Sequence, residues 1–262
     1  MLQEERFARI RNLVDTFSRV STERVALDLN VSRETARRDL VDLEAAGALR
    51  RVHGGAVALG PLPEAPLSVR QRAHPNEKRR IAKAVVQMIK PGQMLFLDAG
   101  TTTAILAEEL VSLTGLTIVT NSVTIALRLS ASAASSASRG ASGHRTILLG
   151  GAIHADTQAT YGDITISEVH RYHADLALLS PVGVNAEHGA TSFEHHECEV
   201  ARAMGLRAGR VILMADHSKI GQVSRVSYLA TGAIGTLVTD SRARGKPALA
   251  ALREAGCPVV LA

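Results

Sequence analysis

The sequence predicts an α/β protein in which a small N-terminal winged helix-turn-helix domain precedes a larger α/β domain with a mostly parallel sheet. Two observations carry this prediction. Three segments with helical periodicity, followed by two short strand-like runs around a Gly-Gly pair, occupy residues 1–57. From residue 77 onward, short apolar runs alternate with helical segments, as in parallel sheets covered by helices. The stretch between them, 58–76, contains four prolines and no periodicity, and we expect it to be a linker between domains at 1–57 and 77–262.

The composition favours a soluble protein with a sizeable core. Of the 262 residues, 46% are hydrophobic and 21% are charged, as in ordinary globular proteins. No apolar run is long enough to cross a bilayer, and the first turns are rich in charge, so we expect a cytoplasmic protein without a membrane partner. The two cysteines, Cys198 and Cys257, form no CxxC pair and support neither a disulfide scaffold nor a zinc finger.

The charge is too evenly spread to form a general basic field. The net charge is +5, but residues 1–57 carry ten arginines against nine acidic residues. Attraction to phosphates acts over about a Debye length of ~8 Å, so nucleic-acid binding must come from local clusters of arginine. Aromatic residues make up only 3% of the chain, without tryptophan, which argues against a stacking platform for single strands. Duplex DNA is the better fit.

Three helices are expected in the N-terminal domain. The first carries an apolar stripe at i, i+3, i+4 and i+7: Ile10, Leu13, Val14 and Phe17. Ser21 or Thr22 can cap the second helix, and Ser32 the third. The inward-facing residues of these two helices are Val25, Ala26, Leu29, Ala36, Leu40 and Leu43. Residues 49–57 then read as two strands around Gly54 and Gly55, which is the shape of a wing.

The third helix is the candidate recognition helix, because its first residues are polar and can reach base edges in the major groove. The candidate DNA-binding residues are Ser32, Arg33, Thr35, Arg37 and Arg38 on this helix and Arg50, Arg51 and His53 on the wing. Arginine can bind guanine O6 and N7 with both arms. Asp39 is expected to pair with a neighbouring arginine. The alternative is that Arg37 and Arg38 form an ordinary solvated helix face.

In the second domain we expect a series of parallel strands with helices between them. The expected strands are 94–97, 116–119, 146–149, 176–180, 211–215, 236–238 and 258–261. The expected helices are 78–89, 104–111, 164–170, 193–208 and 247–255. The Ser-, Ala- and Gly-rich stretch 131–143 is predicted to be a surface loop without a chemical role.

A phosphate-binding loop is expected where the strand 94–97 ends. Asp98 is followed by a turn at Gly100 and by the helix start Thr101, Thr102 and Thr103, where backbone N–H groups and hydroxyls can bind an anion. Asn121 and Ser122 follow a second strand, and Lys219 follows a third. Ligands collect at the carboxyl ends of parallel strands, so these groups can share one site. The alternatives are a plain helix cap and a surface lysine.

Other residues are weaker candidates for the same site. Gly151 and Gly183 can let the backbone approach a ligand, although such glycines more often make turns. Glu194 and His195 are candidate pocket residues, with a solvated helix start as the alternative. His195, Cys198 and Glu199 also have the i, i+3, i+4 spacing of metal ligands, with His188 and His196 nearby. Because no further ligand can be named, we expect no metal and no other cofactor.

The N-terminal residues Val31-Ser32-Arg33-Glu34-Thr35-Ala36-Arg37-Arg38-Asp39-Leu40 and Leu49-Arg50-Arg51-Val52-His53-Gly54-Gly55-Ala56 resemble the DNA-binding signature of the DeoR family of bacterial transcriptional regulators. The resemblance continues at 98–103, 120–122, 150–151 and 216–219, and so covers almost the whole chain. It implies a winged helix joined to a sensor domain similar to sugar-phosphate isomerases. The chain departs from the family at Ala201, where lysine is common, and at Ser180-Pro181, which replaces a glycine-containing turn. These changes bear on the identity of the effector.

The resemblance implies a repressor of a carbohydrate catabolic operon that leaves double-stranded operator DNA when a phosphorylated sugar or related metabolite binds. Two-fold symmetric half-sites would require a homodimer or homotetramer. An alternative is a sugar-phosphate isomerase or hydrolase, with Asp98, Glu194 or His195 as general base. A DNA-binding domain in the same chain favours sensing over turnover, so we expect a regulator and no enzyme.

Overall fold

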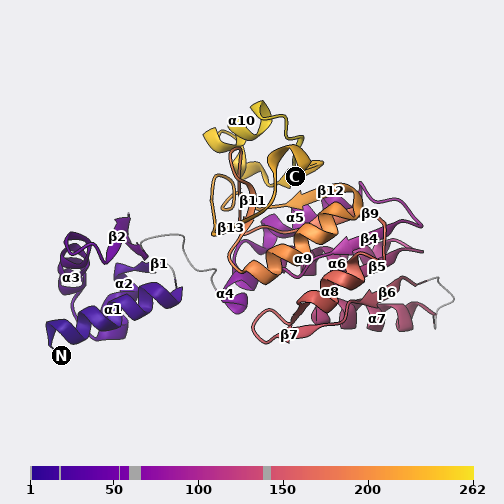
Figure 1. Cartoon of the computed structure of the whole chain (residues 1–262). Coiled ribbons are helices and arrows are strands. Elements are labelled where there is room, and N and C mark those ends of the chain that lie inside the picture. The colour runs from indigo at the N-terminus through magenta and orange to yellow at the C-terminus, as the bar shows by residue number, and fades with distance from the viewer. Residues whose placement is uncertain (1, 18, 53, 59–65, 138–142) are drawn as a thin grey trace. The chain divides into compact units, whose positions relative to one another are not determined.

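The chain forms two compact units, Met1–Val69 and Arg70–Ala262 (Figure 1). The computed structural model describes residues 2–17, 19–52, 54–58, 66–137 and 143–262. Each unit has its own hydrophobic core. Among the described residues, no helix is both long and apolar enough to cross a membrane.

The N-terminal unit has three helices and a small antiparallel sheet. Its elements are α1 (Gln3–Phe17), β1 (Arg19–Ser21), α2 (Thr22–Leu29), α3 (Arg33–Ala45), β2 (Leu49–Val52) and β3 (Gly55–Ala58). The strands lie in the order β1-β3-β2, so β1 adds a third strand that we did not predict to the expected wing. Ile10 and Val14 of α1 pack with Leu40 and Leu43 of α3 in the core, which confirms the predicted apolar stripes.

Helix caps fix the turn between α2 and α3. The hydroxyl of Ser21 accepts a hydrogen bond from the N–H of Arg24, and that of Ser32 accepts one from the N–H of Thr35, both at 3.1 Å. Between the two helices, Asn30 has a positive φ of 52°, a conformation that asparagine tolerates better than most residues. The predicted caps are therefore confirmed, and they hold the start of α3 in place.

An ion pair with a buried carboxylate joins α1 to α3. The carboxylate of Asp39, only 2% exposed, accepts hydrogen bonds from Arg6 Nε at 2.6 Å and from a terminal nitrogen of Arg6 at 2.9 Å. This confirms the prediction that Asp39 serves a neighbouring arginine. The pair anchors the middle of α3 from its inner side.

Replacing Asp39 with Ala is expected to lower the unfolding free energy of the N-terminal unit, because it removes both hydrogen bonds that tie Arg6 of α1 to α3. Hydrogen exchange of the amides of α1 and α3 measures this change. In the control Glu34→Gln, which alters an exposed carboxylate on the same helix, exchange should hardly change. Equal protection in Asp39→Ala and the wild type would contradict the assignment.

A seven-stranded parallel sheet is the frame of the second unit, with the order β15-β14-β12-β9-β4-β5-β6. Its strands are β4 (Met94–Leu97), β5 (Thr117–Thr120), β6 (Arg145–Leu148), β9 (Ala174–Leu179), β12 (Ala208–Met214), β14 (Thr236–Thr239) and β15 (Val259–Leu261). The mostly parallel sheet predicted from the alternating pattern is confirmed.

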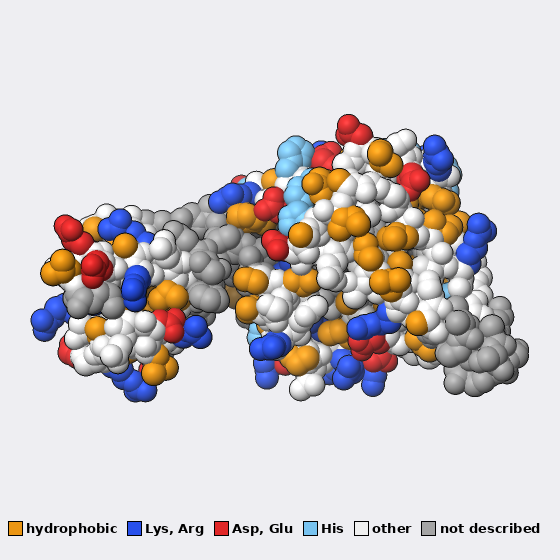
Figure 2. Space-filling view, turned by 90° about the horizontal axis from the view of Figure 1, so that it is seen from below, with side chains coloured by type: hydrophobic (Ala, Val, Ile, Leu, Met, Phe, Trp, Pro, Cys, Tyr) orange, Lys and Arg blue, Asp and Glu red, His pale blue; other side chains and the backbone are white. Residues whose placement is uncertain are grey.

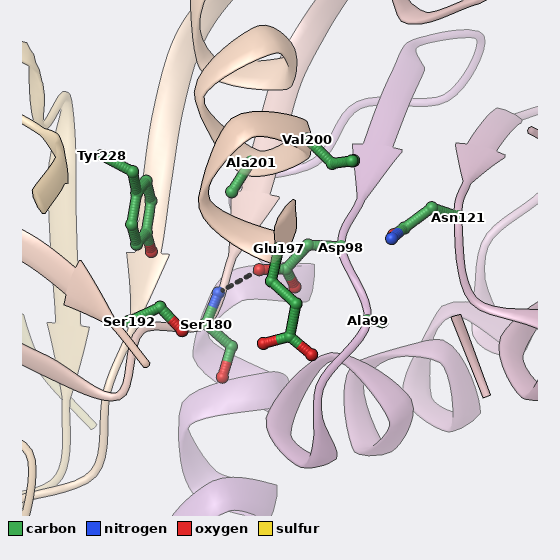
Figure 3. A pocket seen from close by; sticks show the side chains of 9 residues that line it. All are labelled: Asp98, Ala99, Asn121, Ser180, Ser192, Glu197, Val200, Ala201 and Tyr228. Atoms are coloured by element: carbon green, nitrogen blue, oxygen red, sulfur yellow. Dashed lines mark hydrogen bonds between the residues drawn. The ribbon is translucent and has the colours of Figure 1, made fainter. Parts of the chain in front are cut away.

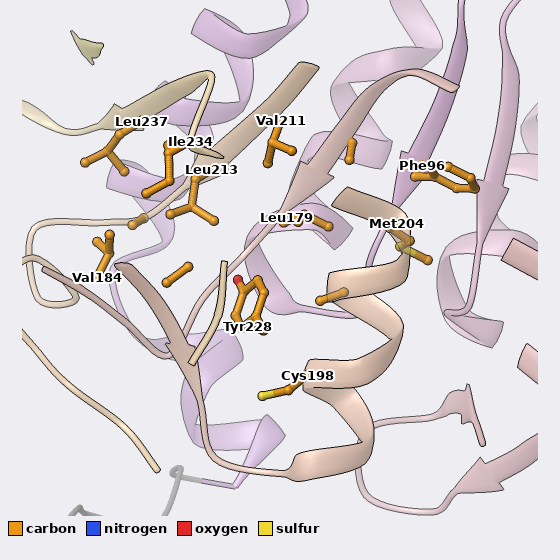
Figure 4. Packing of buried hydrophobic residues seen from close by; sticks show 14 of the residues in the cluster. Phe96, Leu179, Val184, Cys198, Met204, Val211, Leu213, Tyr228, Ile234 and Leu237 are labelled. Atoms are coloured by element: carbon orange, nitrogen blue, oxygen red, sulfur yellow. The ribbon is translucent and has the colours of Figure 1, made fainter. Parts of the chain in front are cut away.

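Helices cover both faces of this sheet. They are α5 (Pro75–Val86), α6 (Thr101–Glu109), α7 (Val123–Ala137), α8 (Asp163–Val169), α9 (His195–Leu206) and α10 (Pro247–Glu254). Alternate residues of each strand face opposite layers: Leu95 and Leu97 belong to the cluster with α5, α6 and α7, and Phe96 to the cluster with α8, α9 and α10. Figure 4 shows Phe96 and Met204 of α9 in the second cluster.

Two small antiparallel sheets, which we did not predict, lie outside the main sheet. β7 (Ala152–His154) pairs with β8 (Ala159–Tyr161), and β10 (Gly183–Asn185), β11 (Gly189–Ser192) and β13 (Val226–Leu229) form the order β10-β11-β13. These strands are only three or four residues long, too short for a clear alternating pattern. β11 and β13 supply walls of the pocket described below.

The predicted surface loop at 131–143 is wrong over its first half. Helix α7 continues to Ala137, because alanine is the strongest helix former and four of the seven residues 131–137 are alanine. Residues 138–142 lie outside the described residues. In the stretch 58–76, the structure contains the short helix α4 (Leu67–Arg72) and the start of α5 at Pro75.

Candidate functional site

The candidate DNA-binding residues lie on the outer side of α3 and on β2. Ser32, Arg33, Arg37 and Arg38 are exposed, as are the wing residues Arg50 and Arg51, and Thr35 is half-buried. His53 lies outside the described residues. On the N-terminal unit in Figure 2, basic side chains are interspersed with acidic ones, so affinity for DNA depends on individual arginines more than on a broad basic patch.

Several of these side chains already have partners. The hydroxyls of Ser32 and Thr35 lie 2.8 Å apart and belong to the helix cap. Arg33 lies 3.8 Å from a carboxylate oxygen of Glu23. Over the described part of the chain, no ion pair involves Arg37, Arg38 or Arg50. These three arginines are therefore the groups best placed to meet phosphates or base edges.

Glu44 positions the wing. Its carboxylate accepts a hydrogen bond from the N–H of Arg51 at 2.7 Å and lies 3.8 Å from the guanidinium of the same residue. This fixes the start of the wing against the end of α3. Sequence analysis did not select Glu44, because an acidic residue in a helix gives no sign of a partner seven residues later.

A pocket opens at the carboxyl edge of the parallel sheet in the second unit (Figure 3). It is lined by Asp98, Ala99, Asn121, Ser180, Ser192, Glu197, Val200, Ala201 and Tyr228. Asp98, Asn121 and Ser180 follow the strands β4, β5 and β9, which are neighbours in the sheet. The structure thus brings together two of the predicted strand-end residues, Asp98 and Asn121.

Asp98 ties two strand ends together. Its Oδ2 accepts a hydrogen bond from the N–H of Ser180 at 2.8 Å, and its side chain is almost fully buried. The next turn is close to the same serine, because a Cβ at Gly100 would lie 3.2 Å from Ser180 Cβ. Glycine therefore allows the start of α6 to approach β9. Figure 3 also shows Glu197 extending from α9 between Ser180 and Ala99.

The N-terminus of α6 has the properties of an anion site. Gly100 is its N-cap and offers no side chain to the first-turn N–H groups. Thr101, Thr102 and Thr103 are all buried, and the hydroxyl of Thr103 donates to the carbonyl of Gly100 at 3.0 Å. Uncapped N–H groups and the helix dipole favour an anion at this position. The threonines themselves are not among the pocket-lining residues.

Asn121 presents an acceptor to the pocket. Its Nδ2 donates to the carbonyl of Thr160 at 3.0 Å, which orients the amide, and its buried Oδ1 has no hydrogen-bond partner among the described residues. A ligand hydroxyl or amino group can satisfy this oxygen. Ser122 has a local role, since its hydroxyl accepts from the N–H of Ile125 in the first turn of α7.

Lys219 lies in the loop after β12, half-buried. β12 and β4 are separated by one strand, which places their ends about 10 Å apart. A second lysine, which sequence analysis missed, lies near Lys219: Lys78, at 3% exposed, in the first turns of α5. Burial lowers the pKa of Lys78 to about 8, Asp216 raises it, and the charges of Lys219 and Arg70 lower it.

The lowered pKa of Lys78 makes stability depend on pH. The unfolded chain, with the ordinary pKa of 10.5, binds more protons than the folded chain between pH 8 and 10.5, so folding is favoured as the pH rises through this window. We expect Lys78→Met to be more stable than the wild type by about 1–2 kcal/mol at pH 7, and this advantage to shrink above pH 8. Chemical denaturation at several pH values measures it. For Lys83→Met, at an exposed position, the difference in unfolding free energy from the wild type should not vary with pH. If the difference for Lys78→Met were also independent of pH, the lowered pKa of Lys78 would be contradicted.

The remaining predicted residues lie outside the pocket lining. A Cβ at Gly151 would lie 2.1 Å from Thr165 Oγ1, and one at Gly183 would lie 2.4 Å from the carbonyl of Gln222, so both glycines serve close packing. Glu194 is the N-cap of α9 without a capping bond. The side chain of His195 is 75% exposed and lies 3.8 Å from Glu199.

The pocket uses a different face of α9 from the one we selected. Glu197, Val200 and Ala201 line it, at the i, i+3, i+4 spacing of one helix face. This spacing could have indicated which face of α9 lines the pocket, but sequence analysis selected Glu194 and His195 instead. Ser192 and Tyr228 come from β11 and β13, and without those strands neither residue could be placed.

The three residues with metal-ligand spacing do not converge. Cys198 is fully buried, and its Sγ lies 3.6 Å from the carbonyl of Val226, whereas His195 is exposed. Burial raises the pKa of the Cys198 thiol to about 11, while a zinc ligand must be a thiolate. In the described ranges, no group of three or more His, Cys, Asp or Glu side chains is arranged to hold a metal ion.

Comparison with known proteins gives the same family for both units. Residues 6–61 match the model of the DeoR-like helix-turn-helix domain, and residues 73–241 that of the DeoR C terminal sensor domain. The chain is 35% identical to the HTH-type transcriptional repressor GlcR of Bacillus subtilis, with 92% of this chain and 89% of that protein covered. It is 31% identical to the HTH-type transcriptional regulator GolR of Listeria innocua, covering 100% of both.

A third relative is the glycerol-3-phosphate regulon repressor of Escherichia coli, 30% identical with 92% of each chain covered. Among solved structures, ribose 5-phosphate isomerase A from Methanocaldococcus jannaschii has a TM-score of 0.38 at 16% identity, over 56% of this chain and 55% of that chain.

Proposed function

Because the chain belongs to the DeoR family of transcriptional regulators, we propose that it represses a carbohydrate operon and leaves its operator when a phosphorylated sugar binds the pocket. The observation that carries this proposal is the pairing, in one chain, of exposed unpaired arginines on α3 with a polar pocket beside an uncapped helix N-terminus. The relatives reported above are named as repressors or regulators, so we assign no catalytic step to Asp98, Glu194 or His195.

The two ends of the effector are expected to bind different groups. The pocket lining contains two carboxylates, Asp98 and Glu197, and no lysine, arginine or histidine. Such a surface repels a phosphate but accepts hydrogen bonds from sugar hydroxyls. The N-terminus of α6 and the Lys219 ammonium suit the phosphate. The sugar therefore lies over Asp98, Asn121 and Glu197, and its phosphate beside α6.

DNA binding is expected to require more than one copy of the chain. One winged unit reads too few base pairs for selectivity in a genome, and a two-fold symmetric operator presents two equivalent half-sites. We therefore propose a homodimer or homotetramer. The effector acts by binding the form with low DNA affinity more tightly than the form with high affinity, since only differential binding shifts the populations.

The proposal is tested by fluorescence anisotropy of labelled DNA from the region upstream of the gene, compared with a scrambled duplex, at several salt concentrations and with a panel of sugar phosphates. We expect selective binding that at least one sugar phosphate abolishes. Equal affinity for both duplexes, falling steeply with salt, would mean nonspecific phosphate attraction only and would overturn the proposal.

Filling the pocket is expected to uncouple the repressor from its effector. Ala201 is nearly buried and lines the pocket, so Ala201→Phe should lower the apparent effector affinity at least tenfold by occupying the space of the sugar. Operator binding without effector should persist. The effector concentration at half-release measures the change. Leu206→Phe, at a 73% exposed position of the same helix, is the control. If the wild type, Ala201→Phe and Leu206→Phe all had the same effector concentration at half-release, the sugar would have to bind elsewhere.

A further inference from the structure

The lining of the pocket in the second unit is acidic. Asp98 and Glu197 both belong to it, and the described residues that line it include no lysine, arginine or histidine. Asp98 is 7% exposed and Glu197 is half-buried. Carboxylates that are withdrawn from bulk water are costly unless a positive charge lies beside them. The pocket therefore favours a ligand that brings a cation with it.

A third acceptor points into the same pocket and independently requires a donor from a ligand. Asn121 is 5% exposed, and its Nδ2 donates to the carbonyl of Thr160 at 3.0 Å, which fixes the orientation of the amide. Its buried Oδ1 has no hydrogen-bond partner among the described residues. Figure 3 shows this side chain extending from the end of β5 toward Asp98. A buried acceptor without a partner is rare in folded proteins, so an N–H or O–H of a ligand is expected to reach it.

The three acceptors approach the pocket from three different elements. Asp98 follows β4, Asn121 follows the neighbouring strand β5, and Glu197 extends from α9. An ammonium group has three N–H donors, no acceptor and a full positive charge. A hydroxyl has one donor and no charge, so it would leave the two carboxylates without a counter-charge. A protonated amine is thus the group that matches both the number of acceptors and their charge.

The wall formed by α9 leaves this charge to the ligand. Ala201 lies one turn after Glu197 on the same face of the helix, at the i, i+4 spacing at which a basic side chain would pair with the carboxylate. Ala201 lines the pocket with a methyl group only. The position next to Glu197 therefore has space for a ligand group, and the protein supplies no cation from this position.

We propose that the pocket selects an amino sugar phosphate, whose protonated amine is held by Asp98, Glu197 and Asn121 Oδ1 while its phosphate lies beside the N-terminus of α6. This inference rests on the proposed function, because it assigns the chemical class of the effector of that same site. The amine and the phosphate have opposite charges, so each end of the ligand meets the part of the site that attracts it. Sugar phosphates without an amine bind more weakly, through their hydroxyls.

The test measures by calorimetry the affinity of the full chain for matched probes. The amino sugar probes are glucosamine 6-phosphate and galactosamine 6-phosphate, and the probes without a charged amine are their N-acetyl derivatives, glucose 6-phosphate and galactose 6-phosphate. We expect at least one of the two amino sugar phosphates to bind about 10- to 100-fold more tightly than its uncharged counterparts, the difference expected for one charged hydrogen bond. Equal or weaker binding of both amino sugar phosphates would overturn the inference.

Two variants locate the amine through the ratio of the affinities for the amino sugar phosphate and for its counterpart without the amine. Glu197→Gln should lower this ratio about tenfold, because it removes one of the two charges that attract the amine. Ala201→Lys should abolish the preference, because its ammonium competes for the same carboxylate. The control Glu199→Gln removes the same charge from another face of α9, where Glu199 lies 3.3 Å from Arg202, and should keep the ratio of the wild type.

The ratio is measured on one protein, so a general loss of affinity in a variant does not imitate the expected change. If Glu197→Gln and Ala201→Lys both kept the ratio of the wild type, the amine would bind elsewhere and the inference would be overturned. If other sugar phosphates of the panel released the operator and neither amino sugar phosphate bound, the inference would fail and the proposed function would stand. If no sugar phosphate bound at all, the proposed function would fail as well.

Discussion

Replacement of Arg37 or Arg38 by Ala is expected to lower the affinity for the operator by about 5- to 150-fold, the range for losing a good contact to a base edge. Both arginines are exposed on α3, and no ion pair within the described residues holds them. Affinity for a scrambled duplex should fall much less, so the ratio of specific to nonspecific binding should drop. Anisotropy with both duplexes measures that ratio.

The control for these variants is Arg11→Ala, which removes the same charge from an exposed position on α1. It should lower both affinities slightly and to the same extent. Effector binding should be unaffected in all three proteins. If Arg37→Ala and Arg38→Ala retained the operator selectivity of the wild type, α3 would not be the recognition helix.

Lys219→Met is expected to give a repressor that stays on its operator in the presence of effector. The substitution removes the ammonium group that we propose to bind the phosphate, and such a charged hydrogen bond is worth about 10- to 100-fold in affinity. Operator affinity without effector should be the same as in the wild type, because Lys219 belongs to the second compact unit and α3 to the first. The shift of the effector concentration at half-release measures the loss.

Lys90→Met, at an exposed position of the same unit, serves as the control for Lys219→Met and should respond normally. A normal response of Lys219→Met itself would place the phosphate away from the loop after β12.

Most of the helices and the main strands could be predicted because each carries a local signal. Ser21 and Ser32 are caps at the head of apolar helical stripes, and the strand β4 was predicted with the bounds that it has in the structure. Both faces of the sheet are buried, so its strands read as continuous apolar runs between helices. Such signals depend only on near neighbours in the sequence.

The pocket was predicted only in part, because it is made by contacts between distant segments. Asp98 and Asn121 could be selected as strand-end residues, and both line the pocket. Tyr228 and Ser192 come from strands that are too short to show an alternating hydrophobic pattern in the sequence. Lys78 looked like an ordinary helix-start lysine; that it is buried depends on α5 packing against the main sheet. The helical structure of residues 131–137 was missed because the Ser-, Ala- and Gly-rich composition was given more weight than the helix propensity of alanine.

The central claim is that one chain couples operator binding to sugar-phosphate binding, and coupling between two binding sites is reciprocal. The most direct test measures, on one preparation, the operator affinity with and without saturating effector and the effector affinity with and without saturating operator. The account predicts that the two ratios are equal and at least tenfold, with each ligand weakening the other. Two affinities that do not respond to each other would contradict it.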